Sequence, residues 1–101
     1  MAWQQVTTRD KVSPETPFAF TIGERNFALY QVASTYYALD NVCPHAFALM
    51  SDGFVEGDTV ECPLHGALFH IPSGRCLGPP ADADLRSYPV RLDDEQILVD
   101  V

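Results

Sequence analysis

The sequence predicts an all-β fold, a small antiparallel β-sandwich or barrel that carries two functional loops. Short runs of β-branched and aromatic residues recur along the chain and are separated by turn residues at close intervals. Eight prolines and six glycines leave little room for a long helix. The 101 residues are enough for one modest core, and no repeat, low-complexity tract or linker divides them. We therefore expect a single domain over residues 1–101.

The expected strands follow one another with short connections. They cover residues 3–6, 18–22, 27–32, 36–39, 59–61, 67–71, 75–77, 88–92 and 96–99. Residues 23–26 and 93–95 hold turn-forming side chains between neighbouring strands, so each is predicted to close a hairpin. The best helix candidate is a single short turn near Pro14 and Glu15.

The charge balance is strongly acidic, with six basic against fourteen acidic residues and a formal net charge of -8. Such a surface repels nucleic acid, and it favours encounter with a protein that carries a basic patch. The N-terminus shows no export signal and no run of 18 apolar residues occurs, so neither export nor a membrane span is indicated. We expect a cytoplasmic protein. Its three cysteines then serve as metal ligands or as buried thiols, because disulfides are rare in that compartment.

Two short segments place a cysteine close to a histidine. The first is Cys43-Pro44-His45, and the second is Cys62-Pro63-Leu64-His65. Each segment comes just after an expected strand, and loops on a rigid scaffold are common places for functional sites. A coincidence of turn-forming sequence is the alternative. The shared placement favours a metal site in which the two loops meet at one end of the sheet.

Two thiolates and two imidazoles suit either zinc or an iron–sulfur cluster. In many zinc fingers the cysteines and the histidines come from separate elements, and the histidines are spaced along a helix. Here each loop supplies one ligand of each kind. An asymmetric [2Fe–2S] cluster uses this arrangement, with two cysteines on one iron and two histidines on the other. Pro44 and Pro63 would stiffen the loops, and Gly66 would relieve crowding where the backbone approaches the cluster.

The pattern resembles the Rieske motif, with sixteen residues between His45 and Cys62. The likeness is strongest over residues 42–80. It includes Ala48, Asp52-Gly53, Glu56-Gly57-Asp58, His65-Gly66, Phe69, Ser73-Gly74 and Gly78-Pro79-Pro80. The resemblance implies one Rieske-type [2Fe–2S] cluster per chain, with Cys43 and Cys62 on the buried iron and His45 and His65 on the iron nearer solvent. It also implies that Gly78-Pro79-Pro80 shields the cluster; an ordinary surface turn is the alternative.

Among Rieske proteins, the chain differs from those of the respiratory complexes. Those proteins have a disulfide between the two cluster loops, at positions that are Ala48 and Leu64 here. They also have a serine and a tyrosine that bond to cluster sulfurs, where this chain has Ala67 and Phe69. Hydrogen bonds to the sulfurs raise the reduction potential, so their loss predicts a potential near the low end of the Rieske range, about -150 mV.

The short chain instead resembles the soluble Rieske ferredoxins of bacterial aromatic-ring-hydroxylating dioxygenase systems, which serve aromatic hydrocarbon catabolism. The resemblance implies a one-electron carrier without turnover of its own, present as a monomer or weak oligomer. It would take electrons from a flavin-dependent NAD(P)H ferredoxin reductase and pass them to a terminal oxygenase. Two alternatives remain, the Rieske-like small subunit of an assimilatory nitrite reductase and a zinc-stabilised interaction domain.

Several residues near the motif are assigned secondary roles. Phe47 and Leu49 are candidates for the rim of a docking surface, with burial beneath the loop as the alternative. His70 and Cys76 are expected not to be ligands, because His70 lies on the strand that leaves the second loop and Cys76 lacks a histidine partner. Partner steering is expected from the acidic side chains between the two loops, which are Asp52, Glu56, Asp58 and Glu61.

Overall fold

The computed structural model describes residues 2–44, 47–64, 66–79, 81 and 83–101. In these residues the chain forms three antiparallel sheets. The first sheet has the order β1 (Trp3–Thr8), β10 (Gln96–Asp100) and β9 (Val90–Asp93). The second has the order β2 (Phe18–Ile22), β3 (Arg25–Val32), β4 (Thr35–Asp40) and β8 (Ser87–Tyr88). The third has the order β5 (Phe54–Glu56), β6 (Thr59–Glu61) and β7 (Leu68–His70).

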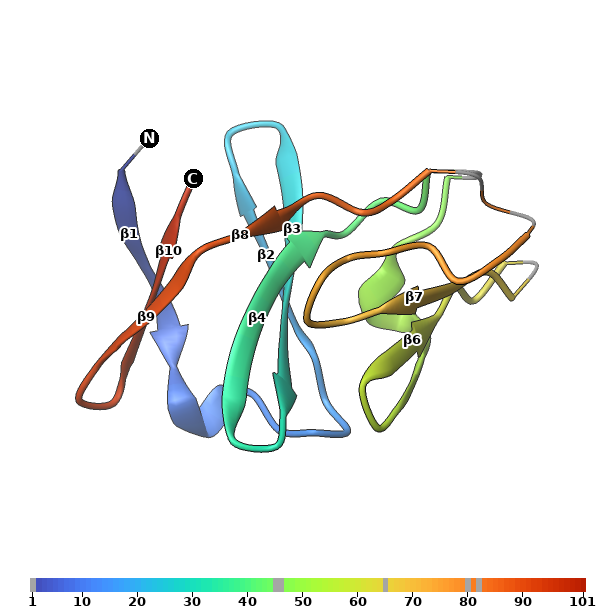
Figure 1. The fold of residues 1–101 in the computed structure, drawn as a ribbon. Helices are drawn as coiled ribbons and strands as arrows, with labels where there is room; N and C mark the ends of the chain where they lie inside the picture. The colour runs from blue at the N-terminus through green and yellow to red at the C-terminus, as the bar shows by residue number, and fades with distance from the viewer. Residues whose placement is uncertain (1, 45–46, 65, 80, 82) are drawn as a thin grey trace.

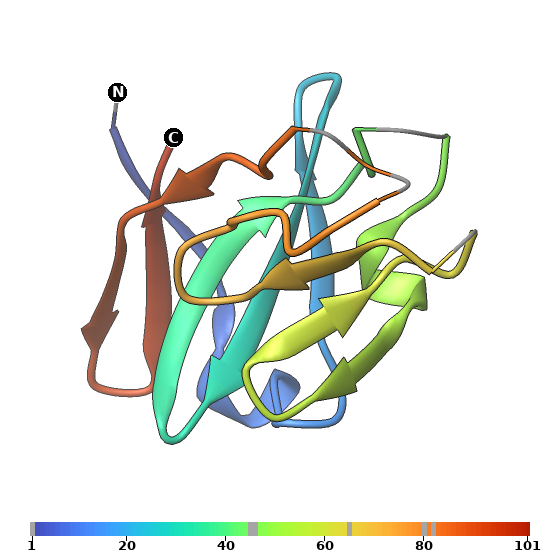
Figure 2. The ribbon, with the colours of Figure 1, turned by 45° about the vertical axis from the view of Figure 1, so that its right-hand side comes forward.

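The second sheet lies between the other two (Figure 1, Figure 2). Strand β3 therefore meets apolar neighbours on both faces, and residues 27–30 are all at most 1% exposed. Phe27 and Leu29 pack with Ile97 of β10 in one core cluster. Ala28 and Tyr30 pack on the other face, in a second cluster that includes residues of the third sheet. Burial on both faces explains the continuous apolar run in this strand.

Local turn chemistry closes the hairpins. Ile22 pairs with Arg25 across Gly23, whose φ of +62° is easily reached by glycine. Asp93 pairs with Gln96, as the sequence predicts for the last hairpin. The predicted all-β antiparallel fold is confirmed.

Three expected elements differ from the structure. The expected strand 88–92 is divided into β8 and β9, which belong to different sheets, because Pro89 has no N–H for a continuous ladder. Residues 75–77 form only an isolated bridge between Cys76 and Phe69. Pro14 and Glu15 form a turn closed by a bridge between Ser13 and Thr16, not a helical turn.

The sequence reading also missed elements. The 3₁₀ turns are η1 (Arg9–Lys11) and η2 (Met50–Asp52), and strand β5 was not expected. Within the described part of the chain, neither turn nor any other helix is long and apolar enough to cross a membrane.

Candidate metal centre

Both cysteine loops close with the same backbone bond. In the first loop, residues 42–49 after β4, the N–H of Cys43 donates to the carbonyl of Ala48 at 2.9 Å. In the second loop, residues 62–67 between β6 and β7, the N–H of Cys62 donates to the carbonyl of Ala67 at 2.7 Å. In each case the acceptor lies five residues after the cysteine. The repeated Cys-Pro segment in the sequence thus corresponds to a repeated backbone hydrogen bond.

The two cysteines are buried together. Cys43 is 2% exposed and Cys62 is 1% exposed, and both belong to one core cluster that also contains Ala67 and Phe69. The loops expose other side chains instead, with Phe47 96% exposed. The structure therefore places two thiols in one apolar cluster, below loops whose outer side chains meet solvent.

His45 and His65 lie outside the described residues. Among the residues that are described, no group of three or more His, Cys, Asp or Glu side chains could hold a metal ion. The structure therefore places both predicted cysteine ligands in one buried cluster, and the complete ligand set remains a prediction.

Asn41 fixes the base of the first loop and was missed by the sequence reasoning. It is 1% exposed, its Nδ2 donates to Ser51 Oγ at 2.9 Å, and its Oδ1 accepts from the Ser51 N–H at 2.7 Å. Its carbonyl accepts from the Met50 N–H at 2.7 Å. A polar residue directly before the motif, at the end of an apolar strand, was the only signal available in the sequence.

Glycine and backbone packing fix the second loop. Gly66 has a φ of +73°, and a Cβ there would meet nothing closer than the Glu61 carboxylate at 3.8 Å. Among the protein atoms, the backbone angle rather than crowding therefore accounts for this glycine. At Gly53, in contrast, a Cβ would lie 2.0 Å from the carbonyl oxygen of Glu61, so the chain before β5 approaches β6 more closely than a side chain allows.

A third segment reaches the cysteine cluster from another side. Residues 78–81, here called the proline loop, end at Ala81, which is 4% exposed and packs in the same cluster as Cys43 and Cys62. Pro79 is exposed, and Pro80 lies outside the described residues. The described residues of the proline loop and of the two cysteine loops are found at one end of the molecule (Figure 1, Figure 2).

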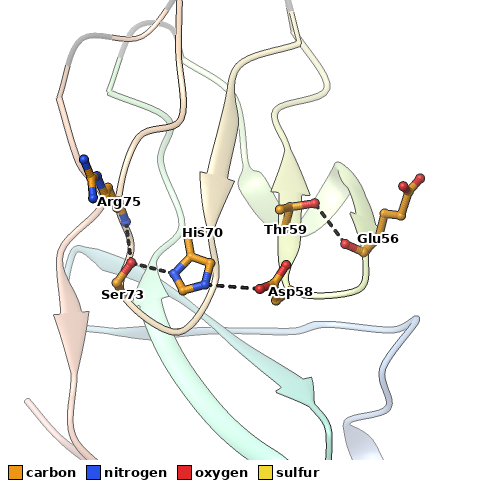
Figure 3. Close-up of polar contacts among 6 residues, drawn as sticks. All are labelled: Glu56, Asp58, Thr59, His70, Ser73 and Arg75. Carbon is orange, nitrogen blue, oxygen red and sulfur yellow. Dashed lines mark hydrogen bonds and ion pairs between the residues drawn. The ribbon is translucent and has the colours of Figure 1, made fainter.

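His70 is bonded to turn residues at the end of β7 away from the second loop. Its Nε2 lies 3.2 Å from Asp58 Oδ2, and its Nδ1 lies 2.7 Å from Ser73 Oγ (Figure 3). Ser73 Oγ also accepts from the N–H of Arg75 at 3.2 Å. Both ring nitrogens of His70 thus have protein partners, which favours the interpretation that His70 is not a metal ligand.

Two buried tyrosines pack near the strands that lead to the first loop. Burial raises the pKa of Tyr30 well above its usual range, and its hydroxyl has no hydrogen-bond partner among the described residues. Burial, followed by the hydrogen bond from its hydroxyl to Asp40 Oδ1 at 2.6 Å, raises the pKa of Tyr88. Both side chains therefore stay neutral at physiological pH. The Tyr88 bond ties β8 to the last residue of β4, just before the first loop.

The model of one protein family, the Rieske [2Fe–2S] domain, matches residues 2–89. The chain belongs to this family. Among curated relatives of this Rieske chain, the ferredoxin component of the naphthalene 1,2-dioxygenase system of Pseudomonas aeruginosa is 41% identical over 81 residues. Those residues make up 80% of this chain and 78% of the relative.

Solved structures agree with this assignment over nearly the whole chain. The ferredoxin of Sphingomonas yanoikuyae B1 has a TM-score of 0.93 and 28% identity, and 99% of each chain is covered. A complex of reduced oxygenase and oxidized ferredoxin in carbazole 1,9a-dioxygenase contains a chain with a TM-score of 0.89 and 28% identity, covering 96% of this chain and 91% of that one. A structure described as a nitrite reductase small subunit has a TM-score of 0.82 and 26% identity, with full coverage of both chains.

The described residues fit the Rieske [2Fe–2S] cluster that this family carries. Cys43 and Cys62 supply two sulfur donors inside one apolar cluster, from loops that share the same closing hydrogen bond. Thiolates are the ligand form of cysteine, and burying two of them requires a cation beside them. Their depth suits the iron that is farther from solvent.

Proposed function

We propose that this Rieske chain is the soluble ferredoxin of an aromatic-ring-hydroxylating dioxygenase system. It would take single electrons from a flavin-dependent NAD(P)H reductase and deliver them to a terminal oxygenase. The observation that carries this proposal is the pair of buried cysteines below exposed loops, in a chain similar over most of its length to ferredoxin components of such systems. The oxygenase–ferredoxin complex of carbazole 1,9a-dioxygenase supports an oxygenase as one partner.

The proposal assigns each ligand a position. Cys43 and Cys62 would hold the inner iron, and His45 and His65 the outer iron. When bound, the cluster takes up and releases one electron at a time. The protein supplies two loops, each closed by a backbone hydrogen bond, an apolar enclosure for the sulfur ligands, and an exposed end at which a partner can approach.

We further propose one Rieske domain over residues 1–101. Strand β10 near the C-terminus pairs with β1 near the N-terminus, so both ends of the chain belong to one sheet. A cytoplasmic location, in monomeric or weakly associated form, belongs to the same proposal, because thiol ligands and a nicotinamide-dependent reductase suit that compartment.

Exposed apolar side chains surround the loops that would hold the cluster. Phe47 of the first loop is 96% exposed, Leu64 of the second is 42% exposed, and Leu77, just before the proline loop, is 49% exposed. Leu49 is 39% exposed, so neither Phe47 nor Leu49 is in the core. Transient redox interfaces are small and have an apolar centre, so we assign partner docking to this end of the molecule.

The acidic side chains between the loops differ in how free they are to steer a partner. Asp58 is bonded to His70, whereas Asp52 and Glu56 are exposed at the surface. Glu61 is half-buried beside the second loop. Glu56 pairs with Thr59 at the end of the third sheet away from the second loop, so steering is assigned mainly to Asp52 and Glu61.

The nitrite reductase alternative has weaker support, because the named relative at 41% identity is a dioxygenase ferredoxin component, whereas the nitrite reductase structure is 26% identical. A permanent subunit would elute with its large enzyme in gel filtration of the native protein. A mobile carrier should elute alone or as a weak assembly.

Electron transfer to a purified dioxygenase terminal oxygenase tests the proposal, with a dioxygenase reductase and NAD(P)H as the electron source.

Phe47→Asp should slow reduction of the oxygenase by roughly tenfold and leave the cluster spectrum unchanged, because it places a charge in the apolar docking centre. Leu92→Asp is the matched control, since Leu92 is 41% exposed on β9 in the far sheet. Equal rates of oxygenase reduction by wild type and Phe47→Asp would show that Phe47 is not part of the interface. A wild-type chain that transfers no electrons would contradict the proposed function.

A further inference from the structure

The thiol of Cys76 lies between two backbone carbonyls of the proline loop. Its Sγ is 3.3 Å from the carbonyl oxygen of Gly78 and 3.2 Å from that of Ala81. A thiol has one proton, so it donates to one of these oxygens at a time or is shared between them. The two acceptors are the first and last residues of the loop, so the sulfur connects both of its ends.

The proline loop has little capacity to hold itself. Pro79 and Pro80 have no N–H, so neither can donate a backbone bond to the rest of the chain. Gly78 adopts a φ of +154°, which side chains rarely allow and which glycine reaches freely. The Cys76 thiol supplies a donor from outside the loop to the carbonyls at its two ends, Gly78 and Ala81.

Cys76 is itself firmly placed by its backbone. Its N–H donates to Asp84 Oδ1 at 2.8 Å, and its bridge with Phe69 joins it to β7. The next residue, Leu77, donates to the carbonyl of Leu68 at 2.8 Å. Strand β7 leaves the second cysteine loop, and Phe69 is fully buried in the cluster that contains Cys62. The thiol thus links the proline loop to β7, the strand that follows the loop of the proposed ligand Cys62.

We propose that Cys76 is a positioning residue that holds the proline loop against the buried cysteine cluster and thereby sets water access to the metal centre and its reduction potential. The inner end of the loop, Ala81, packs in the cluster that contains Cys43 and Cys62, so loosening the loop would open that cluster to solvent. The inference rests on the proposed function in one respect, that the two cysteines hold the Rieske cluster.

The direction of the effect follows from charge. One-electron reduction makes the centre more negative, and nearby water stabilises added charge more than an apolar enclosure does. A looser loop should therefore raise the reduction potential. If the Cys76 side chain only filled space, it would act as a small apolar side chain. Cys76→Ala would then have the same effect as any other small loss of core packing.

Three variants of the cluster-containing protein separate these possibilities. Cys76→Ala removes the donor, Cys76→Ser keeps a hydroxyl donor, and Val55→Ala is the control. Val55 is a half-buried residue of β5 that packs on the same core and makes no bond to the proline loop in the structure. Two quantities are measured for each variant, the hydrogen-exchange rate of the peptide covering residues 77–85 and the midpoint potential.

Cys76→Ala should exchange roughly threefold faster in this peptide, the change expected for loss of one weak hydrogen bond, and its potential should rise. Cys76→Ser should stay closer to wild type in both quantities, and Val55→Ala should leave both unchanged. The inference is overturned if Cys76→Ala matches wild type, if Cys76→Ser shifts as far as Cys76→Ala, or if Val55→Ala shifts equally. Absence of a Rieske signal in the wild type would instead contradict the proposed function, and the exchange rates would still test the bond to the loop.

Discussion

At the scale of single residues, the three cysteines differ in their surroundings. Cys43 and Cys62 are almost fully buried in one cluster, each at the start of a loop with the same closing bond. Cys76 is half-buried, and its sulfur contacts two carbonyl oxygens. These surroundings support our proposal that the first two ligate the cluster and that the third has a structural role.

Substitution of the individual cysteines tests this assignment. Cys43→Ser and Cys62→Ser should each abolish or strongly deplete the cluster, because a hydroxyl is a poor substitute for a thiolate on iron. Cys76→Ser should retain it and serves as the matched control. Iron content per chain and the visible spectrum measure the outcome. Loss of the cluster in Cys76→Ser would show that the ligand assignment is wrong.

The residues next to the second cysteine bear on the reduction potential. Ala67 and Phe69 are both fully buried, and neither has a side-chain donor for a cluster sulfur. Fewer such hydrogen bonds leave the reduced, more negative cluster less stabilised, which places the potential near the low end of the Rieske range, about -150 mV. A redox titration checks this value. A clearly positive midpoint would mean that donors other than these side chains stabilise the reduced cluster.

Some site residues could be predicted from the sequence and others could not. The position of Cys43 and Cys62 in loops after strands was predictable, because each is followed by proline and preceded by a short strand, and these are local signals; their ligation remains a proposal. The bonds between Asn41 and Ser51 were not, because they join side chains ten residues apart whose approach depends on the η2 turn. The predicted ligands His45 and His65 lie outside the described residues and remain predictions.

At the scale of secondary-structure elements, close backbone contacts determine how the third sheet joins the rest. A Cβ at Gly74 would lie 2.1 Å from the carbonyl oxygen of Leu85, and Leu85 donates its N–H to the Gly74 carbonyl at 2.8 Å. Gly57 has a similar positive φ, +59° against +76° at Gly74, but has open space around it. A side chain at Gly57 would meet only the unfavourable backbone angle, whereas a side chain at Gly74 would also collide with the backbone of Leu85. Comparing the two positions therefore separates the cost of the angle from the cost of the collision.

Replacing these glycines by alanine should give unequal losses of stability. Gly57→Ala should lower the free energy of unfolding by about 1 kcal/mol, the cost of a left-handed backbone angle in alanine. Gly74→Ala should cost roughly 3 kcal/mol or more, because backbone atoms near Leu85 must also move. Chemical denaturation of both variants measures the difference. Equal losses would contradict the close approach at Gly74.

Element prediction succeeded where local turns determine pairing and failed where distant contacts do. The hairpins closed at Gly23 and at residues 93–95 were predicted from turn residues alone. Residues 75–77 have a strand-like sequence, but they pair with β7 only through the short bridge around Cys76, and on the other side the N–H of Cys76 bonds to the Asp84 side chain and not to a further strand. The break at Pro89 was signalled by proline, yet the move of the chain from one sheet to another depends on packing of the whole fold.

At the scale of the whole molecule, the net charge of -8 governs encounter with partners. Acidic side chains near the cysteine loops would attract a basic patch over a distance set by salt, about 8 Å at physiological ionic strength. Electron transfer that depends on this attraction should slow as salt rises.

Two doubly substituted variants localise the attraction. Asp52→Asn with Glu61→Gln should slow electron transfer to the oxygenase at low salt and weaken its salt dependence, by about half if these residues dominate the steering. Asp93→Asn with Asp94→Asn removes the same charge from the far hairpin and should have little effect. Rates measured across a salt series compare them. The same loss in both variants would indicate that total charge, and not its position near the loops, controls encounter.

The measurement that tests the account most directly is the electron paramagnetic resonance spectrum of the dithionite-reduced protein, with iron and zinc analysis of the same sample. A Rieske-type signal with two irons per chain is the predicted result, because Cys43 and Cys62 would then hold a [2Fe–2S] cluster with two histidines. A silent sample that contains one zinc per chain would contradict the electron-carrier account and would favour a zinc-stabilised interaction domain.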